Sequence, residues 1–294
     1  MLTRRSALAV AAAASLGAKA SPLRFGFSLY GMKSIPVRRA LDLCAQIGYK
    51  AVELALMPGW DTEPKRLSKA DRSELRSKLK NLDLTLPAVM DNLKLLAPQA
   101  EQRANLERLK AAADIAHEVS PGRPAVIETI LGGRPGEWEE KKQAMAAELR
   151  VWAETLAPLK TVVAIKPHVS GAMNLPDKAL WMVHRVASPW VKLVYDYSHY
   201  ELHNLDLKET MRQLARQSVF AHIKDSEGSA GKFKFLLPGD GRIDYKAYVR
   251  MLTLAGYKGA VVVEVSSQIS GQRGYDPIYA AKHCYEKIAP AFGL

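Results

Sequence analysis

The fold is decided by the stretch 191–225, which reads VKLVYDYSHYELHNLDLKETMRQLARQSVFAHIKD. It contains two short apolar runs rich in β-branched residues, 191–195 and 219–223, a pattern typical of strands buried on both faces. Runs of the same kind recur along the chain, and eight can be counted, at 23–29, 51–56, 84–89, 125–130, 161–165, 191–195, 219–223 and 260–265. Such runs predict a parallel sheet with helices on both faces.

The segments between the runs have helical spacing, for example 37–47, 75–82, 104–119 and 141–156. Asp276-Pro277 is typical of a helix start, and Gly48 and Gly256 are typical of helix ends. Eight strand–helix units after residue 20 average about 34 residues each, which fits a (β/α)8 TIM barrel. An open doubly wound sheet would favour a G-x-G-x-x-G loop after the first strand, and the sequence has none there. We therefore predict an α/β protein, a single TIM-barrel domain over 21–294.

The first 20 residues have the pattern of an export signal. Arg4-Arg5 precedes the apolar stretch 7–16, and Ala18-Lys19-Ala20 fits a cleavage site. Paired arginines with a mild, alanine-rich stretch indicate a twin-arginine signal and a periplasmic protein, whereas an ordinary secretory signal is the alternative. No apolar run reaches the roughly 18 residues of a membrane span, so we expect no membrane anchor after cleavage.

Composition and charge indicate a folded protein with no nucleic-acid partner. Hydrophobic residues make up 48% of the chain and charged residues 24%, a balance that excludes a disordered chain. The formal charge of +12 falls to +9 without residues 1–20. Its lysines and arginines are scattered over polar helical segments such as 64–80 and 101–110, which is typical of solvated helix faces.

The two cysteines exclude a disulfide-rich scaffold and a four-cysteine zinc module. Cys44 lies in the first predicted barrel helix and Cys284 in the last, and closing the ring makes those helices neighbours. An oxidising compartment would permit a disulfide between them, while two buried free thiols are the alternative.

Polar residues interrupt the last four apolar runs, all at the same end. The interruptions are Lys166-Pro167-His168, Asp196-Tyr197-Ser198-His199, His222-Ile223-Lys224-Asp225 and Glu264. In a TIM barrel the C-terminal ends of the strands form the active site. Imidazole and carboxylate groups are the ligands of a divalent transition metal such as Mn, Zn, Co or Fe. Asp196, His222 and Glu264 are therefore the predicted ligands of one such ion.

Further residues are candidates for contact with a substrate. Glu53 and Glu128 lie on the second and fourth predicted strands, where substrate contact and a buried ion pair are both open. Trp60 is a candidate platform for a sugar ring or a packing residue, and Lys224 could bind an anionic group or a neighbouring carboxylate. His199 is expected to make a hydrogen bond either to a residue of the site or to the substrate. The stretch 226–237 contains glycines and lysines and is predicted to be a mobile loop that could close over the mouth of the barrel.

The tract from Gly48 to the C-terminus resembles the sugar-phosphate isomerase/epimerase family of the xylose-isomerase-like TIM-barrel superfamily. The similar pieces are Gly48-Tyr49-Lys50-Ala51-Val52-Glu53-Leu54, Asp196-Tyr197-Ser198-His199, His222-Ile223-Lys224-Asp225, Pro238-Gly239-Asp240-Gly241-Arg242-Ile243-Asp244 and Val262-Val263-Glu264. The resemblance implies one divalent metal held by Glu, Asp, His and Glu from the last four strands. Three of these positions carry over to Asp196, His222 and Glu264.

The fourth position departs from the family pattern, because Lys166 stands where the family has glutamate. An ammonium group next to a dication is repelled. His168 could take the fourth metal position with Lys166 facing substrate, or Lys166 could replace the charge of the metal.

The resemblance implies proton abstraction next to a sugar carbonyl, through a stabilised enediolate. Glu264 is then the catalytic base, with Lys166 or His168 as the second acid–base group. We expect a small carbohydrate substrate, and an oligomer is possible. β-Elimination from an oxidised (keto) glycoside and non-catalytic sugar binding are the alternatives. A nuclease related to endonuclease IV would need more metal ligands than the strand ends supply.

Overall fold

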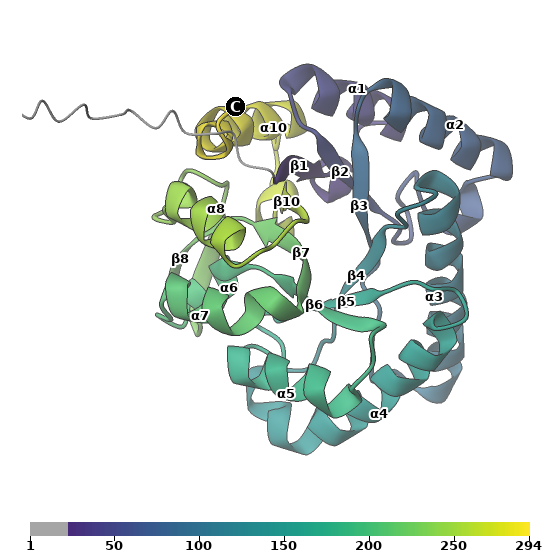
Figure 1. Ribbon diagram of the computed structural model, residues 1–294, viewed down its shortest axis with the longest axis vertical. Coiled ribbons are helices and arrows are strands. Elements are labelled where there is room, and N and C mark those ends of the chain that lie inside the picture. The colour runs from purple at the N-terminus through teal and green to yellow at the C-terminus, as the bar shows by residue number, and fades with distance from the viewer. Residues whose placement is uncertain (1–22) are drawn as a thin grey trace, which may run out of the picture.

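The computed structural model describes residues 23–294, and the predicted export signal lies outside them. Eight parallel strands close into a barrel in the order β1-β10-β7-β6-β5-β4-β3-β2 (Figure 1). The strands are β1 (Arg24–Ser28), β2 (Ala51–Ala55), β3 (Thr85–Met90), β4 (Val126–Ile130), β5 (Val163–Lys166), β6 (Val191–Tyr195), β7 (Ser218–Ile223) and β10 (Ala260–Val263). The TIM barrel is confirmed, and every predicted apolar run overlaps one of its strands.

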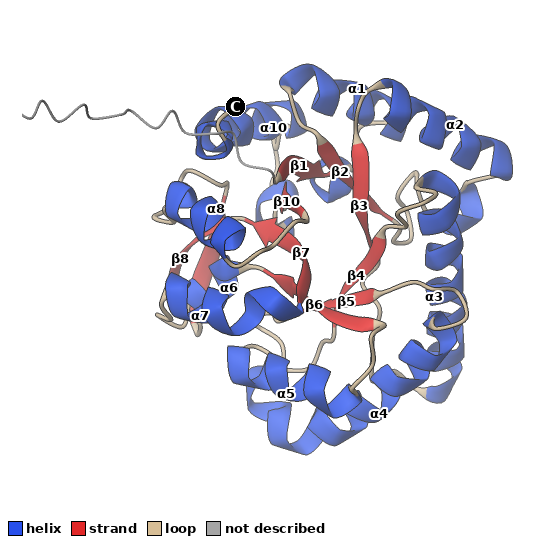
Figure 2. Cartoon of the chain, in the orientation of Figure 1, coloured by secondary structure: helices blue, strands red, loops and turns tan. Residues whose placement is uncertain are grey.

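Helices surround the barrel on the outside (Figure 2). They are α1 (Val37–Ile47), α2 (Lys69–Asn81), α3 (Gln99–Val119), α4 (Trp138–Leu156), α5 (Pro176–Val186), α6 (Tyr197–Glu201), α7 (Leu207–Leu214), α8 (Tyr245–Leu254), α9 (Ser267–Ser270) and α10 (Pro277–Ile288). Short 3-10 turns are η1 (Leu29–Met32), η2 (Pro64–Arg66), η3 (Pro135–Glu137), η4 (Ala215–Gln217) and η5 (Ala289–Phe292). No helix within residues 23–294 is long and apolar enough to cross a membrane.

The predicted helix ends have clear local causes. Asp276 caps α10 by accepting hydrogen bonds from the backbone N–H groups of Ile278 and Tyr279. Gly48 ends α1 with φ of 118°, a left-handed conformation that favours glycine. Helix α2 begins six residues before the predicted segment because Ser68 and Asp71 form a capping box. Its first turn is polar and therefore carries no apolar periodicity.

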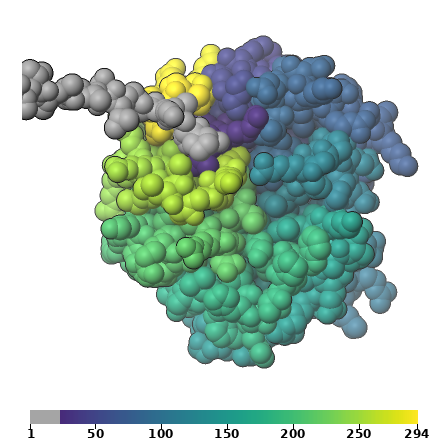
Figure 3. Space-filling model, viewed as in Figure 1, coloured from purple at the N-terminus to yellow at the C-terminus, as the bar shows by residue number. Residues whose placement is uncertain are grey.

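The first and last helices are neighbours, as expected from closing the ring. Helix α10 packs beside α1, so that the two ends of the described chain meet on one side of the barrel (Figure 3). Cys44 and Cys284 are nevertheless free and buried. The suggested disulfide is therefore wrong, and the two cysteines belong to the apolar core between the helices and the sheet.

The stretch 226–237 is not a loop. Strands β8 (Asp225–Ser229) and β9 (Lys232–Leu236) pair as an antiparallel hairpin with five residues on each side. Phe235 is buried in this hairpin, with its ring centroid 5.3 Å from that of His199. The expectation of a loop was wrong because alternating Phe233 and Phe235 give the segment one apolar face, which the glycines and lysines obscured.

Candidate active site

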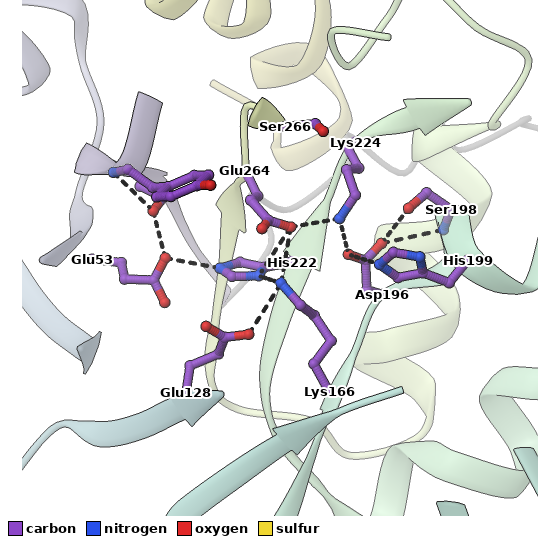
Figure 4. A network of polar contacts seen from close by, with 12 residues as sticks. Glu53, Glu128, Lys166, Asp196, Ser198, His199, His222, Lys224, Glu264 and Ser266 are labelled. Atoms are coloured by element: carbon purple, nitrogen blue, oxygen red, sulfur yellow. Dashed lines mark hydrogen bonds and ion pairs between the residues drawn. The ribbon is translucent and has the colours of Figure 1, made fainter. Parts of the chain in front are cut away.

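The side chains that point into the barrel form two layers. The lower layer is apolar and consists mainly of Ala51, Ala88, Ala164, Val194, Phe220 and Val262, with Val126 packed against it. Side chains two residues apart on a strand share a face, so the next layer toward the C-terminal ends lies two residues further along each strand. That layer contains Glu53, Met90, Glu128, Lys166, Asp196, His222 and Glu264. The strand register thus collects the polar interruptions at one end of the barrel (Figure 4).

Glu264 lies at the centre of this polar layer. Its Oε2 accepts from the ammonium groups of Lys166 at 3.0 Å and Lys224 at 2.5 Å. Burial alone would raise the pKa of Glu264, but these two ammonium groups outweigh it and hold the pKa well below its ordinary value. Glu264 is therefore a carboxylate at neutral pH. Its side chain is 11% exposed, more than that of any other carboxylate in the layer.

The ammonium of Lys166 faces three acceptor groups inside the protein. Besides Glu264, its Nζ lies 3.0 Å from Glu128 Oε1 and 3.1 Å from His222 Nδ1. Burial lowers the pKa of this lysine, but Glu128, Glu264 and Asp196 raise it further, so the net shift is upward. Lys166 is therefore a fixed positive charge and a poor nucleophile.

Lys224 comes one residue after β7 and links two of the predicted metal ligands. Its Nζ lies 2.5 Å from Asp196 Oδ2 and 2.5 Å from Glu264 Oε2. The third ammonium hydrogen has no partner among the residues that the structure describes. The ammonium also lies 5.0 Å from the ring centroid of Phe235, on the hairpin. Lys224 can therefore donate one hydrogen bond to a bound molecule.

His222 is held from both sides of its ring. Its Nε2 lies 3.0 Å from Glu53 Oε2, which also accepts a 2.5 Å hydrogen bond from the hydroxyl of Ser28. Since Lys166 donates to Nδ1, the ring carries its proton on Nε2 and donates it to Glu53. Burial alone would lower the pKa of His222, but the carboxylates of Glu53 and Glu264 outweigh it, so the net shift is upward. Glu53 and His222 are both completely buried, so Glu53 positions the imidazole.

Asp196 is oriented by its own strand end. Its Oδ1 accepts a 2.6 Å hydrogen bond from the hydroxyl of Ser198. His199 takes a hydrogen bond from the N–H of Val169 at Nδ1, so the neutral ring turns Nε2–H toward Asp196 Oδ2, 3.4 Å away. Burial, aided by Lys224, lowers the pKa of His199 to about 4, so it is neutral near pH 7.

Asp196, His222 and Glu264 offer ligand atoms that lie within 4.8 Å of one another, a group that could hold a metal ion. Their chemistry and spacing suit a divalent ion. Their facing atoms, however, already hold ammonium groups: Asp196 Oδ2 and Glu264 Oε2 are bridged by Lys224, and His222 Nδ1 accepts from Lys166. In this arrangement the donor set does not fit a divalent ion, because two ammonium groups already hold the atoms that would bind it.

His168, the predicted fourth ligand, is directed elsewhere. Its Nδ1 accepts a hydrogen bond from the N–H of Ser170, and its ring lies 4.3 Å from that of His199. The neutral ring therefore carries its proton on Nε2. With Lys166, His168 lines a cavity of about 210 Å³. Burial, with His199 and Lys224 nearby, holds the pKa of His168 well below its ordinary value.

A larger cleft opens at the mouth of the barrel, beside the loop that follows β10. Its volume is about 460 Å³, and its lining includes Tyr30, Trp60, Ser267, Ser270 and Tyr275. Trp60 stacks on Tyr30 at 5.6 Å between ring centroids, and the ammonium of Lys33 lies 4.0 Å above the Trp60 ring. The indole N–H of Trp60 has no hydrogen-bond partner within residues 23–294.

Two residues that matter for the site were missed in the sequence. Ser28 hydrogen-bonds Glu53, and Tyr30 is close enough to Glu264 and Lys166 for their charges to act on its hydroxyl. Gly26 pairs with Ala51 in the sheet, and Ser28 and Glu53 each lie two residues further along their strands. The alternation of side chains along a strand could therefore have predicted that Ser28 faces the same way as Glu53. Tyr30 follows the strand in a 3-10 turn, whose direction no periodicity reveals.

The fold and the site together define the class of protein, a (β/α)8 barrel with a buried carboxylate–imidazole group at the C-terminal ends of its strands. The family model described as "Xylose isomerase-like TIM barrel" matches residues 41–282. The chain therefore belongs to the xylose isomerase-like TIM-barrel family. The broader of the two resemblances found in the sequence is thereby confirmed.

Known proteins of similar sequence include sugar enzymes. The rhizopine catabolism protein MocC of Rhizobium meliloti is 24% identical over 277 residues, covering 86% of this chain and 81% of MocC. The L-ribulose-5-phosphate 3-epimerase UlaE of Escherichia coli O157:H7 is 24% identical over 243 residues, covering 78% of this chain and 81% of UlaE. For UlaE of Shigella flexneri the match covers only 41% of the relative.

Solved structures show the same fold. The apo form of the 3-keto-D-glucoside 4-epimerase YcjR from E. coli has a TM-score of 0.70 at 17% identity, covering 91% of this chain and 99% of YcjR. The IolI protein, solved with a zinc atom bound, has a TM-score of 0.73 at 19% identity, covering 92% of this chain and all of IolI, 100%. At these sequence identities the structural similarity shows only that the barrel fold is shared.

Proposed function

We propose that this protein is a sugar isomerase or epimerase that moves a proton at the carbon next to a carbonyl group. The proposal depends on one observation: Glu264 is an ionised carboxylate at the mouth of the barrel, next to an ammonium group with a free hydrogen. Its Oε1 makes no hydrogen bond to any residue in 23–294, which leaves that oxygen available as a general base. The sugar epimerases among the similar proteins support the same substrate class.

The proposed reaction begins with transfer of the carbon-bound proton to Glu264 Oε1. The electron pair of the C–H bond becomes the C=C bond of an enediolate, and the carbonyl oxygen becomes negatively charged. The free hydrogen of Lys224 would stabilise that oxygen. Return of the proton from Glu264 to the neighbouring carbon completes isomerisation, while His168 Nε2–H can exchange a proton with the sugar oxygens.

Isomerisation is favoured over epimerisation by the number of accessible bases. Epimerisation needs a second group on the opposite face of the carbon to return the proton. Glu53 and Glu128 are completely buried and bound to His222 and Lys166, respectively. Glu264 alone among these carboxylates faces the mouth, so removal and return on the same face is the chemistry that fits best.

The 460 Å³ cleft gives a second candidate function. It lies beside the segment that follows Glu264 and is lined by aromatic and hydroxyl side chains, Tyr30, Trp60, Ser267 and Tyr275 among them. Rings of this kind pack against sugars, and the space can hold a second sugar or an aglycone. β-Elimination from a keto-glycoside would use the same first step. The carbonyl group then re-forms, the C=C bond moves to the α and β carbons as the C–O bond at the β carbon breaks, and the leaving alkoxide takes a proton from His168.

Proton exchange tests the proposed function. The protein is incubated in D₂O with aldoses, ketoses and keto-glycosides, and deuterium at the carbon next to the carbonyl is followed by NMR. We expect exchange with at least one sugar, and a loss of at least about 100-fold in Glu264→Gln. Release of p-nitrophenol from an oxidised p-nitrophenyl glycoside separates elimination from isomerisation.

Glu227→Gln is the matched control, because Glu227 lies on the exposed hairpin in an ion pair with Lys234. It should exchange deuterium at the rate of the unchanged protein. Tight sugar binding without exchange in any sugar would instead identify a binding protein, and full exchange in Glu264→Gln would exclude Glu264 as the base.

A further inference from the structure

We propose that the ammonium groups of Lys166 and Lys224 take the place of the divalent ion, so that the site works without a metal. The three candidate ligands are all occupied by these two groups. Asp196 Oδ2 binds Lys224, Glu264 Oε2 binds both lysines, and His222 Nδ1 binds Lys166. Two ammonium groups carry the same charge of +2 as the ion they replace.

Lys166 cannot leave this position easily. Its side chain is 2% exposed, and Glu128, which is completely buried, holds the ammonium from the side away from Glu264. Losing the proton would leave Glu128 as a buried carboxylate without a counterion, which is strongly unfavourable in a low-dielectric interior. An ion bound to His222 and Glu264 would therefore lie beside a permanent positive charge.

The position of Lys166 on its strand explains how one residue changes the site. It ends β5, two residues after Ala164 of the lower layer, so its side chain necessarily points into the barrel. A carboxylate at this position would complete a ring of oxygen and nitrogen ligands. A lysine reaches the same point with the opposite charge, and Glu128 on the neighbouring strand supplies the counter-charge, 3.0 Å away.

Lys224 can polarise a carbonyl oxygen, which is the electrophilic role that a divalent ion would otherwise have. Two of its hydrogens bind Asp196 and Glu264, and the third is free among the described residues. A single N–H donor at a buried carboxylate pair can polarise a carbonyl oxygen. Lys166, whose ammonium lies within about 3 Å of Glu264 and His222, is by contrast a positioning residue that holds both side chains in place.

Metal binding tests this inference without any assay of turnover. The full chain is dialysed against metal-free buffer, analysed for bound elements and titrated with Mn²⁺, Zn²⁺ and Co²⁺ by calorimetry. The unchanged protein should contain no stoichiometric metal and give no saturable binding. Because no sugar is involved, failure of the proposed sugar reaction would leave this result interpretable.

Substitutions make the expectation specific. Lys166→Glu supplies a fourth carboxylate, and Lys166→Glu combined with Lys224→Met also clears the space between Asp196 and Glu264. These variants should bind one divalent ion at least about 100-fold more tightly than the unchanged protein. If the carboxylate variants do not fold, Lys166→Met and Lys224→Met test the same point by removing one positive charge each.

Lys208→Met is the control, because Lys208 is exposed on α7, on the outside of the barrel. It should bind metal no better than the unchanged protein. Retention of one ion per chain by the unchanged protein would overturn the inference. Equally, no gain of metal binding in any lysine variant would show that the ammonium groups are not what excludes the ion.

Discussion

At the scale of single residues, the site follows from strand parity and one substitution. The predicted strand ends brought Asp196, His222 and Glu264 together, and strand parity explains why Glu53 faces the same way, since each lies two residues beyond an inward-facing residue. Parity could not predict the role of Lys166, because whether a buried lysine turns toward a carboxylate or toward a substrate depends on its neighbours across the barrel. Glu128, on the adjacent strand, decides that orientation.

Asp91 is a second buried charge at the mouth, and it makes stability depend on pH. It follows β3, is completely buried and pairs through Oδ1 with Arg108, while Oδ2 has no partner in the described chain. Burial raises its pKa to about 6, with Glu63 adding to the shift and Arg108 opposing it. The folded protein therefore binds a proton that the unfolded chain releases near pH 3.8.

Between about pH 4 and pH 6 the folded state binds more protons at Asp91 than the unfolded state, so the free energy of unfolding falls as the pH rises through this range. We expect Asp91→Asn to abolish that contribution, which is at most about 3 kcal/mol. Urea unfolding of both proteins from pH 4 to pH 7 measures it. A stability difference that stays constant across this range would contradict the assigned pKa.

At the scale of elements, the strands were predictable and the hairpin was not. Apolar runs mark β-strands because both faces of a barrel strand are buried. The hairpin β8–β9 has only one buried face, and its sequence is mostly polar. Its placement depends on contacts that are remote in sequence, such as the side-chain oxygen of Gln268, which accepts a hydrogen bond from Phe235 N–H.

Phe235 couples this hairpin to the site, which gives a prediction for the element. Its ring lies 5.3 Å from that of His199 and 5.0 Å from the ammonium of Lys224. Phe235→Ala should lower stability by about 3 kcal/mol and reduce deuterium exchange more than stability alone explains, because water would reach Lys224. Phe233→Ala is the control, since Phe233 is only partly buried and packs on Phe235.

Denaturant unfolding and exchange rates of these two variants, measured at a temperature where both are folded, separate packing from function. Equal loss of exchange in Phe233→Ala and Phe235→Ala would show that the hairpin only contributes stability. A normal exchange rate in Phe235→Ala would show that the hairpin does not shield the site.

At the scale of the whole molecule, the order of strands and helices was predictable because each strand–helix unit repeats the same burial pattern. This burial pattern does not predict how closely β1 packs against its two neighbouring strands where the barrel closes. Strand β1 lies between β10 and β2 in the barrel, and Gly26 pairs with Val262 on one side and Ala51 on the other. Closure therefore depends on the space available at these pairs.

Gly26 is the residue at which closure can be tested. A Cβ atom added there would lie 2.6 Å from the carbonyl oxygen of Ala51 and 2.8 Å from its Cβ, both of which are fixed in β2. Gly26→Ala should therefore separate β1 from β2 and destabilise the barrel by about 2 kcal/mol or more. Gly136→Ala is the matched control, because a Cβ there meets nothing within 4 Å. Thermal unfolding should show a lower midpoint for Gly26→Ala in one cooperative transition, since all eight strands share the ring. Equal midpoints for the two variants would mean that the barrel accommodates the added methyl group elsewhere.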